Sequence, residues 1–142
     1  MSPASIPPAS IPVYSPVDAR LVADPPICSA DEVAAAVARA RSAQQNWAAR
    51  PIGERVRILR TFARRLGEQR LELATIVRSE TGKPHTEALA EILSALEAIR
   101  FYARVAPDLF REQRVPTGWI RGKSARIVRE PWGVVGAITP WN

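Results

Sequence analysis

An uninterrupted apolar run at residues 133–138, Gly-Val-Val-Gly-Ala-Ile, limits the folds that are open to this chain. Its length suits a single strand, and no polar residue alternates with the apolar ones. Both faces of such a strand have to be covered by other parts of the protein, which is typical of parallel sheets flanked by helices. The run therefore predicts an α/β fold in which residues 133–138 form a buried strand.

Helical periodicity dominates the chain between residues 29 and 80. Ser29 and Glu32 have the spacing of a capping box, which predicts that the first helix begins just after Ser29. Pro51 is expected to end that helix or to occupy the first turn of the next one. Gly67 is expected to weaken or break the second helix, after which the helical pattern resumes to about residue 80.

A loop is predicted at residues 81–84, because Gly82 and Pro84 both interrupt regular structure. A long amphipathic helix is expected from about residue 86 to residue 105, with Pro107 marking its end. Residues 115–129 alternate in polarity and contain turn residues, which predicts strands joined by turns.

The start of the chain has a different composition. Residues 1–12 are rich in proline and serine, which predicts a mobile tail. Two short extended pieces are expected at residues 13–14 and 20–22, with residues 16–19 forming the turn between them.

The chain is basic, with 20 basic and 14 acidic residues among 142 and a net charge of +6. Such an excess is compatible with an acidic partner such as nucleic acid. The arginines are interleaved with glutamates along the predicted helices, however, and this arrangement favours a solvated helix face. We therefore expect no nucleic-acid partner.

Cys28 is the only cysteine, which excludes an intrachain disulfide and a cysteine-rich metal site. Neither Cys28 nor the only histidine, His85, is expected to be catalytic, and no metal site is predicted. No segment is long and apolar enough to span a membrane, and the first residues lack the charge and apolar core of a secretory signal. A cytoplasmic protein is the expectation, and a single cysteine suits a reducing compartment.

The last thirteen residues, 130–142, read Glu-Pro-Trp-Gly-Val-Val-Gly-Ala-Ile-Thr-Pro-Trp-Asn and resemble the aldehyde dehydrogenase family. In that family a buried strand opens the dinucleotide-binding domain and leads into a Pro-Trp-Asn turn. Residues 79–84, Ser-Glu-Thr-Gly-Lys-Pro, are similar to the family's Glu-x-Gly-Lys-Pro loop. The resemblance covers residues 13–142 and is greatest to the succinate-semialdehyde group; the family's spacing is also similar at Ala38, Ala40, Trp47, Arg55 and Leu59.

The resemblance implies the N-terminal portion of the aldehyde dehydrogenase fold. This portion has a helical layer, an oligomerisation-arm hairpin and the first strand of a Rossmann-like parallel sheet. The implied boundaries are a tail at 1–12, the helical part of the dinucleotide-binding domain at 13–112, the arm at 113–130, and the strand with its Pro-Trp-Asn turn at 131–142.

The resemblance also implies a reaction, the oxidation of an aldehyde to a carboxylate with NAD or NADP as the hydride acceptor. The amide of Asn142 would stabilise the alkoxide that forms when a thiolate attacks the aldehyde. Four residues would line the cofactor cleft at the carboxyl end of the strand: Ile138, Thr139, Pro140 and Trp141. The family's nucleophilic cysteine and general base lie downstream of this turn. The 142 residues are therefore expected to be inactive by themselves and to belong to a homo-oligomer.

Other interpretations remain open. From the tripeptide alone, Trp141 is equally a packing residue and Asn142 a turn residue. A non-catalytic fragment that pairs with a full-length relative is a second hypothesis. A small basic nucleic-acid-binding protein is a third, against which the lack of an aromatic–basic cluster counts.

Overall fold

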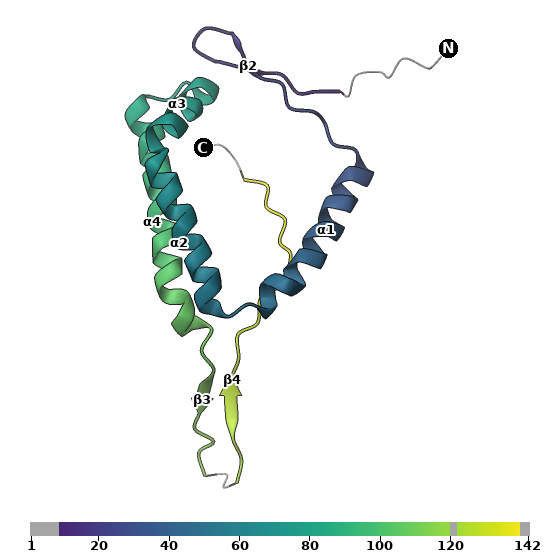
Figure 1. Ribbon diagram of the computed structural model, residues 1–142, viewed down its shortest axis with the longest axis vertical. Coiled ribbons are helices and arrows are strands. Elements are labelled where there is room, and N and C mark those ends of the chain that lie inside the picture. Colours follow the sequence, from purple (N-terminus) through teal and green to yellow (C-terminus); the bar gives the residue numbers. More distant parts are fainter. Residues whose placement is uncertain (1–8, 120–121, 140–142) are drawn as a thin grey trace, which may run out of the picture. The chain divides into compact units, whose positions relative to one another are not determined.

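The computed structural model describes residues 9–119 and 122–139. Within these ranges the chain forms four helices and two separate two-stranded antiparallel sheets (Figure 1). The chain divides into two compact units. Unit 1 comprises residues 1–35 and 64–97, and unit 2 comprises residues 36–63 and 98–142.

The first sheet, in unit 1, confirms the two predicted extended pieces. Strand β1 (Val13–Tyr14) pairs antiparallel with β2 (Leu21–Ala23). The turn between them is closed where the Ser15 N–H donates to the Arg20 carbonyl at 2.9 Å. Backbone pairing extends outward from this hairpin, because the Ile27 N–H donates to the Ala9 carbonyl at 2.7 Å. The paired region thus begins inside the stretch that was expected to be a tail.

Helix α1 (Ala30–Ala49) begins at the predicted capping box. The Ser29 hydroxyl accepts from the Glu32 N–H at 3.3 Å, and the Glu32 carboxylate accepts from the Ser29 N–H at 2.7 Å. Helix α2 (Ile52–Glu68) begins directly after Pro51, as expected. Gly67 remains helical, and the break falls at Gln69, before α3 (Arg70–Thr81).

Gly82 ends α3 in the left-handed conformation, with φ of 73°, and its N–H donates to the Arg78 carbonyl at 2.9 Å. The predicted loop then leads into α4 (His85–Leu109). The expectation that Pro107 ends this helix was wrong, because α4 continues to Leu109. Proline disturbs the helix at its own position and at the carbonyl four residues before it, but it does not prevent later hydrogen bonds. The Phe110 N–H still donates to the Ala106 carbonyl at 3.0 Å.

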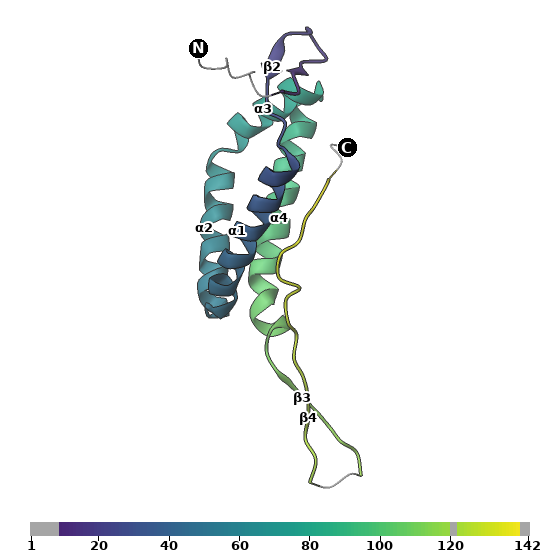
Figure 2. The same cartoon turned by 90° about the vertical axis from the view of Figure 1, so that its right-hand side faces the viewer.

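The second sheet, in unit 2, is a hairpin of β3 (Gln113–Val115) and β4 (Ala125–Ile127). Its antiparallel register pairs Gln113 with Ile127 and Val115 with Ala125. All six strand residues are exposed. Figures 1 and 2 both show the hairpin extending from the C-terminal end of α4. The predicted strands and turns of residues 115–129 are confirmed, with the first strand slightly earlier than expected.

The predicted strand at residues 133–138 is not formed, and residues 131–139 have no regular secondary structure. A strand requires hydrogen-bonding neighbours, and both sheets in the described residues are complete two-stranded hairpins made by other segments. The apolar side chains of the run are therefore uncovered: Val135 is 74% exposed and Ile138 fully exposed. The parallel sheet expected from the sequence is thus absent from the described part of the chain.

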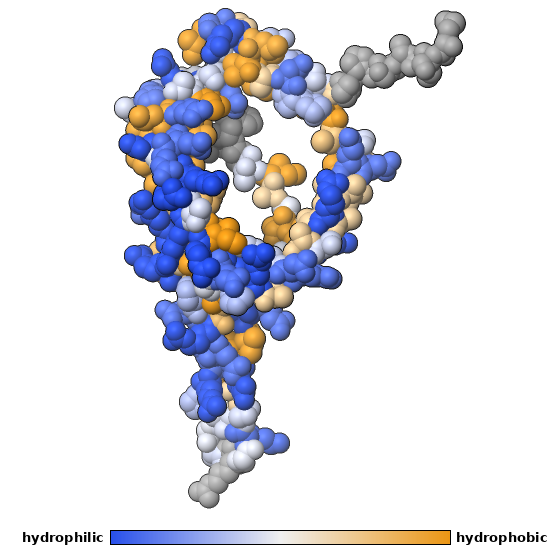
Figure 3. Space-filling model, viewed as in Figure 1, coloured by the Kyte–Doolittle hydropathy of each residue, from blue (hydrophilic) through white to orange (hydrophobic). Residues whose placement is uncertain are grey.

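Few side chains are buried in either unit. The buried apolar residues of the described chain are mostly small, which limits the stabilisation from burial: Val56, Ala63, Ala74, Ala88, Leu96 and Ala103. Helix α1 contains no buried residue. Figure 3 shows hydrophobic side chains of the C-terminal segment at the surface of the molecule. No described helix is long and apolar enough to cross a membrane.

Candidate functional site

The five residues predicted to form the site fall at the end of the chain. Ile138 and Thr139 are described by the structure, and both are exposed. Pro140, Trp141 and Asn142 lie outside the described residues. The side chain of Ile138 and the hydroxyl of Thr139 are therefore the parts of the predicted site whose surroundings are known, and neither is covered by the rest of unit 2.

The segment that leads to these residues is tied to unit 2 at its start. One guanidinium nitrogen of Arg129, Nη1, donates to the Leu109 carbonyl at 3.1 Å. Leu109 is the last residue of α4, and Arg129 lies two residues beyond β4. This hydrogen bond therefore joins the two ends of the β3–β4 hairpin to each other. No local sequence pattern predicts this hydrogen bond, because its partners are 20 residues apart.

The same segment then turns beside α1. Gly133 has φ of 95°, a conformation that side chains rarely adopt. A Cβ atom built on Gly133 would lie 3.8 Å from Cδ of Gln44, which is ordinary van der Waals contact. Gly133 is thus required by its backbone angle and not by lack of space.

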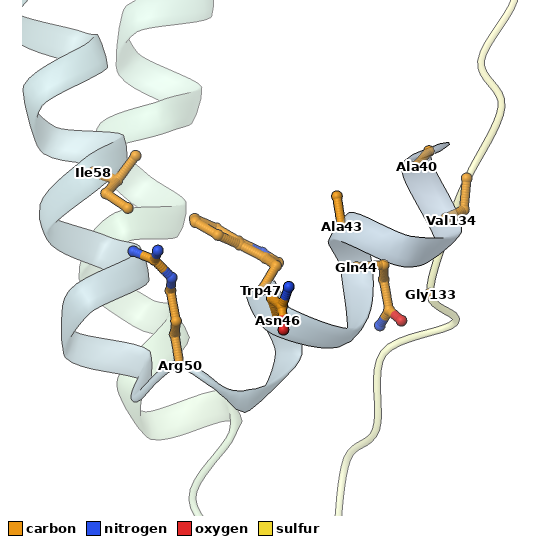
Figure 4. A pocket seen from close by; sticks show the side chains of 9 residues that line it. All are labelled: Ala40, Ala43, Gln44, Asn46, Trp47, Arg50, Ile58, Gly133 and Val134. Carbon is orange, nitrogen blue, oxygen red and sulfur yellow. The ribbon is translucent and has the colours of Figure 1, made fainter. Parts of the chain in front are cut away.

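A pocket of about 640 Å³ lies where this segment passes α1, within unit 2 (Figure 4). Its walls are mainly apolar and include one cationic side chain; the lining residues are Ala40, Ala43, Gln44, Asn46, Trp47, Arg50, Ile58, Gly133 and Val134. Figure 4 shows the Trp47 ring extending toward Ile58 of α2, with the Arg50 side chain beneath it. Trp47 was singled out in the sequence by its spacing, whereas Arg50 and Gln44 belong to no recognised motif.

Arg55 is a second residue whose spacing matched the family. Its guanidinium carbon lies 5.4 Å from the centroid of the Phe110 ring, which is a cation–π contact. The Nε atom of Arg55 is buried and has no hydrogen-bond partner. This contact links the N-terminal part of α2 to the residue that follows α4.

The carboxylates with shifted pKa values belong to a helix cap and a turn. The backbone N–H and then the hydroxyl of Ser29 lower the pKa of Glu32, and the Ser15 hydroxyl lowers the pKa of Asp18. Both carboxylates sit at a helix cap or a turn of unit 1. Cys28 is exposed before α1, and His85 is the exposed first residue of α4.

Comparison with known proteins gives these features a context. The sequence matches the aldehyde dehydrogenase family over residues 4–142. A putative NADP(+) succinate-semialdehyde dehydrogenase of Mycolicibacterium smegmatis is 41% identical over 118 residues, which are 82% of this chain and 23% of that protein.

Two solved structures are also similar. An NADP-dependent enzyme of E. coli superposes with a TM-score of 0.86 at 32% identity, over 93% of this chain and 27% of that one. A putative methylmalonate-semialdehyde dehydrogenase of Sinorhizobium meliloti, solved with NAD, gives a TM-score of 0.85 at 28% identity, over 94% and 27%. The chain therefore spans about a quarter of the length of these relatives.

Proposed function

The chain belongs to the aldehyde dehydrogenase family, and we propose that its 142 residues are the N-terminal part of an NAD(P)-dependent enzyme that oxidises an aldehyde to a carboxylate. The observation that carries this proposal is the match over residues 4–142, which includes both the Gly82 loop and the run that leads to Asn142. The chain's likeness to the M. smegmatis relative favours succinate semialdehyde as substrate and NADP as cofactor.

We assign the catalytic role within these residues to Asn142. When a thiolate adds to the aldehyde carbon, a carbon–sulfur bond forms and the carbonyl oxygen takes up the negative charge. An amide N–H that is already in place stabilises this oxyanion without reorganisation, and removal of one such donor typically costs about 10²–10³-fold in kcat. Asn142 is the donor that we propose for this oxyanion.

Ile138, Thr139, Pro140 and Trp141 are proposed to line the cofactor cleft. The described members of this set fit a nicotinamide nucleotide, because Ile138 offers an uncovered apolar side chain and Thr139 an uncovered hydroxyl, with a backbone that is not used in a sheet. The bound cofactor would supply the hydride acceptor. Ile138 would pack against a ring face of the cofactor, and the Thr139 hydroxyl would hydrogen-bond one of its polar groups.

The thiolate is not proposed to come from these residues. Cys28 is exposed in the loop before α1, and the nucleophilic cysteine of the family lies downstream of the Pro-Trp-Asn sequence that ends these residues. We therefore propose that residues 1–142 do not carry out the oxidation by themselves. The β3–β4 hairpin, whose strand residues are all exposed, is proposed to be the arm that pairs with another copy in a cytoplasmic homo-oligomer.

The test is an assay of the full-length protein. Formation of NADPH and NADH is measured with succinate semialdehyde, an aminoaldehyde and benzaldehyde as substrates, and the expected result is aldehyde-dependent reduction that is fastest with NADP and succinate semialdehyde. Asn142→Ala should lower kcat by about 10²–10³-fold. Gln45→Ala, at an exposed position of α1 outside the pocket, is the control and should leave kcat near the wild-type value. An Asn142→Ala enzyme with wild-type kcat would contradict the proposed role.

A second function, a non-catalytic fragment that pairs with a longer relative, is favoured by one observation. Helix α1 has no buried residue, and Val33 is 54% exposed. Exposed apolar faces of this kind are typical of surfaces that are covered by a partner. The intact mass of the native protein distinguishes the two functions. The fragment hypothesis requires a chain of 15.6 kDa that co-purifies with a longer relative, whereas the first function requires a heavier chain with aldehyde-dependent activity.

A further inference from the structure

The hydrogen bond between Arg129 and Leu109 joins the segment that follows β4 to the C-terminal end of α4. We propose that Arg129 is a positioning residue: by holding the C-terminal end of α4, it fixes the direction in which residues 130–139 leave the β3–β4 hairpin. This inference rests on the proposed function, because it concerns the placement of the proposed oxyanion donor.

The helix end gives this bond its strength. The last carbonyl groups of a helix have no N–H partner within the helix, and they form the negative end of the helix dipole. The Leu109 carbonyl is such a group, and it accepts from a guanidinium at 3.1 Å. A cation at this place satisfies the free carbonyl and also interacts favourably with the dipole, so a neutral side chain cannot replace both effects.

The bond lies beyond the last pair of the β3–β4 ladder, so it restrains a segment that the ladder does not hold. In the described residues the β3–β4 ladder ends at the Gln113–Ile127 pair. The ion pair between Arg126 and Glu112, at 2.9 Å, lies beside that last pair and does not reach α4. The Arg129 bond therefore ties the segment that follows β4 to the end of α4, beyond the last pair of the ladder.

A second feature shows that the path beyond Arg129 is defined. Pro131 restricts the backbone two residues later, and Gly133 then turns the chain beside Gln44 of α1. The start and the turn of the segment are thus set by α4 and α1, within one unit. Displacement of a reacting or stabilising group by about 1 Å can cost on the order of 10²-fold in rate, so the direction of this segment matters for catalysis.

The chain offers a matched control at the same helix end. Arg111 forms an ion pair with Asp108 at 2.8 Å, and both side chains are about three-quarters exposed. Arg111→Gln removes the same charge near the C-terminus of α4 but leaves the tie to the outgoing segment in place. A general electrostatic effect would therefore appear in both variants, whereas a positioning effect would appear only at Arg129.

The experiment compares Arg129→Gln, Arg129→Lys and Arg111→Gln in the full-length enzyme, with kcat and KM measured for aldehyde and cofactor. We expect Arg129→Gln to lower kcat by about tenfold while both KM values change by less than about twofold, since binding contacts remain. Arg129→Lys keeps a cationic donor for the Leu109 carbonyl and should recover most of the lost kcat. Arg111→Gln should resemble the wild type.

Several results would overturn the inference. Wild-type kcat in Arg129→Gln, equal losses in Arg129→Gln and Arg111→Gln, or no recovery in Arg129→Lys would each do so. If Arg129→Gln does not fold, hydrogen exchange of residues 130–139 of the full-length enzyme is compared in Arg129→Met, which keeps the apolar stem without the donor, and Arg129→Lys. Faster exchange in Arg129→Met alone supports the inference, and equal exchange in both variants opposes it. A wild-type protein without NAD(P)-linked aldehyde oxidation removes the proposed function and this inference together, whereas an active wild type with an unaffected Arg129→Gln removes only the inference.

Discussion

Gly82 and Pro16 approach each other so closely that a Cβ atom at position 82 would lie 2.8 Å from Cγ of Pro16. Gly82 also has φ of 73°, in the left-handed region. Two independent requirements thus call for glycine at the end of α3, where the chain meets the turn between β1 and β2. They give a physical reason for the glycine in the Glu-x-Gly-Lys-Pro pattern.

Gly82→Ala should therefore destabilise unit 1 strongly. The left-handed backbone alone costs a side chain about 1–3 kcal/mol, and the contact with Pro16 adds to this loss. The free energy of unfolding, measured by urea denaturation, should fall accordingly. In a Pro16→Ala background the same substitution should cost less, because the contact is relieved while the backbone strain remains.

Gly53→Ala is the control for this measurement. Gly53 lies in α2, its φ is not positive, and nothing lies within 4 Å of a Cβ built there. Alanine is a better helix former than glycine, so the change should be neutral or stabilising by up to about 1 kcal/mol. Equal destabilisation by Gly82→Ala and Gly53→Ala would contradict the explanation.

The capping box at the start of α1 makes a second prediction. Ser29→Ala removes the hydroxyl that accepts from the Glu32 N–H, and loss of such a cap typically costs about 1 kcal/mol of stability. Ser29→Thr, which keeps a hydroxyl, should retain most of this contribution. Urea denaturation of the two variants measures the difference, and equal losses would show that the cap contributes nothing.

The pKa of Glu32, measured by NMR titration, should also reflect the capping box with Ser29. Its pKa is lowered first by the backbone N–H of Ser29 and second by the Ser29 hydroxyl, so Ser29→Ala should raise it only part of the way to the ordinary value. A group whose pKa is lowered on folding contributes stability above its unfolded pKa, and this contribution is lost as the pH falls through the folded pKa. The wild type should therefore lose more stability than Glu32→Gln over this acidic range.

The contact of Arg55 with Phe110 makes a third prediction, on the link between α2 and the end of α4. A double-mutant cycle with Arg55→Met and Phe110→Leu should give a coupling energy of about 0.5–1 kcal/mol, as expected for a partly exposed cation–π pair. Arg55→Met alone should cost little, because methionine keeps the apolar stem and removes the unpaired buried Nε. A coupling energy of zero would mean that the two side chains are neighbours without mutual stabilisation.

Local signals in the sequence predicted the helix boundaries well. Ser29 with Glu32 and the left-handed Gly82 each act within a few residues of the backbone that they cap, so their effect is readable from neighbouring letters. Pro107 was misread because a proline in the last turn removes one hydrogen bond but does not force the helix to stop. The amphipathic pattern also ended the helix too early, at about residue 105, whereas the helix continues to Leu109.

Features that depend on distant segments could not be predicted in the same way. The apolar run at 133–138 shows what surroundings a strand there would need, but pairing depends on neighbours that are absent from the described residues. The ties that hold unit 2, Arg55 on Phe110 and Arg129 on Leu109, join residues far apart in sequence. The roles of Ile138 and Asn142 were inferred from resemblance to a family, not from any physical pattern of the chain.

The turn of the C-terminal segment at Gly133 makes the last prediction. Gly133 has φ of 95°, while space exists for a Cβ beside Gln44, so Gly133→Ala should cost about 1–3 kcal/mol through backbone strain alone. The strained segment relieves itself by leaving α1, which should weaken the NMR nuclear Overhauser contacts between residue 133 and the Gln44 side chain. Gly136→Ala is the control, because Gly136 has no positive φ and nothing within 4 Å of its Cβ position. Loss of these contacts in Gly133→Ala alone would show that α1 and Gly133 define the path of this segment, and equal contacts in both variants would show that they do not.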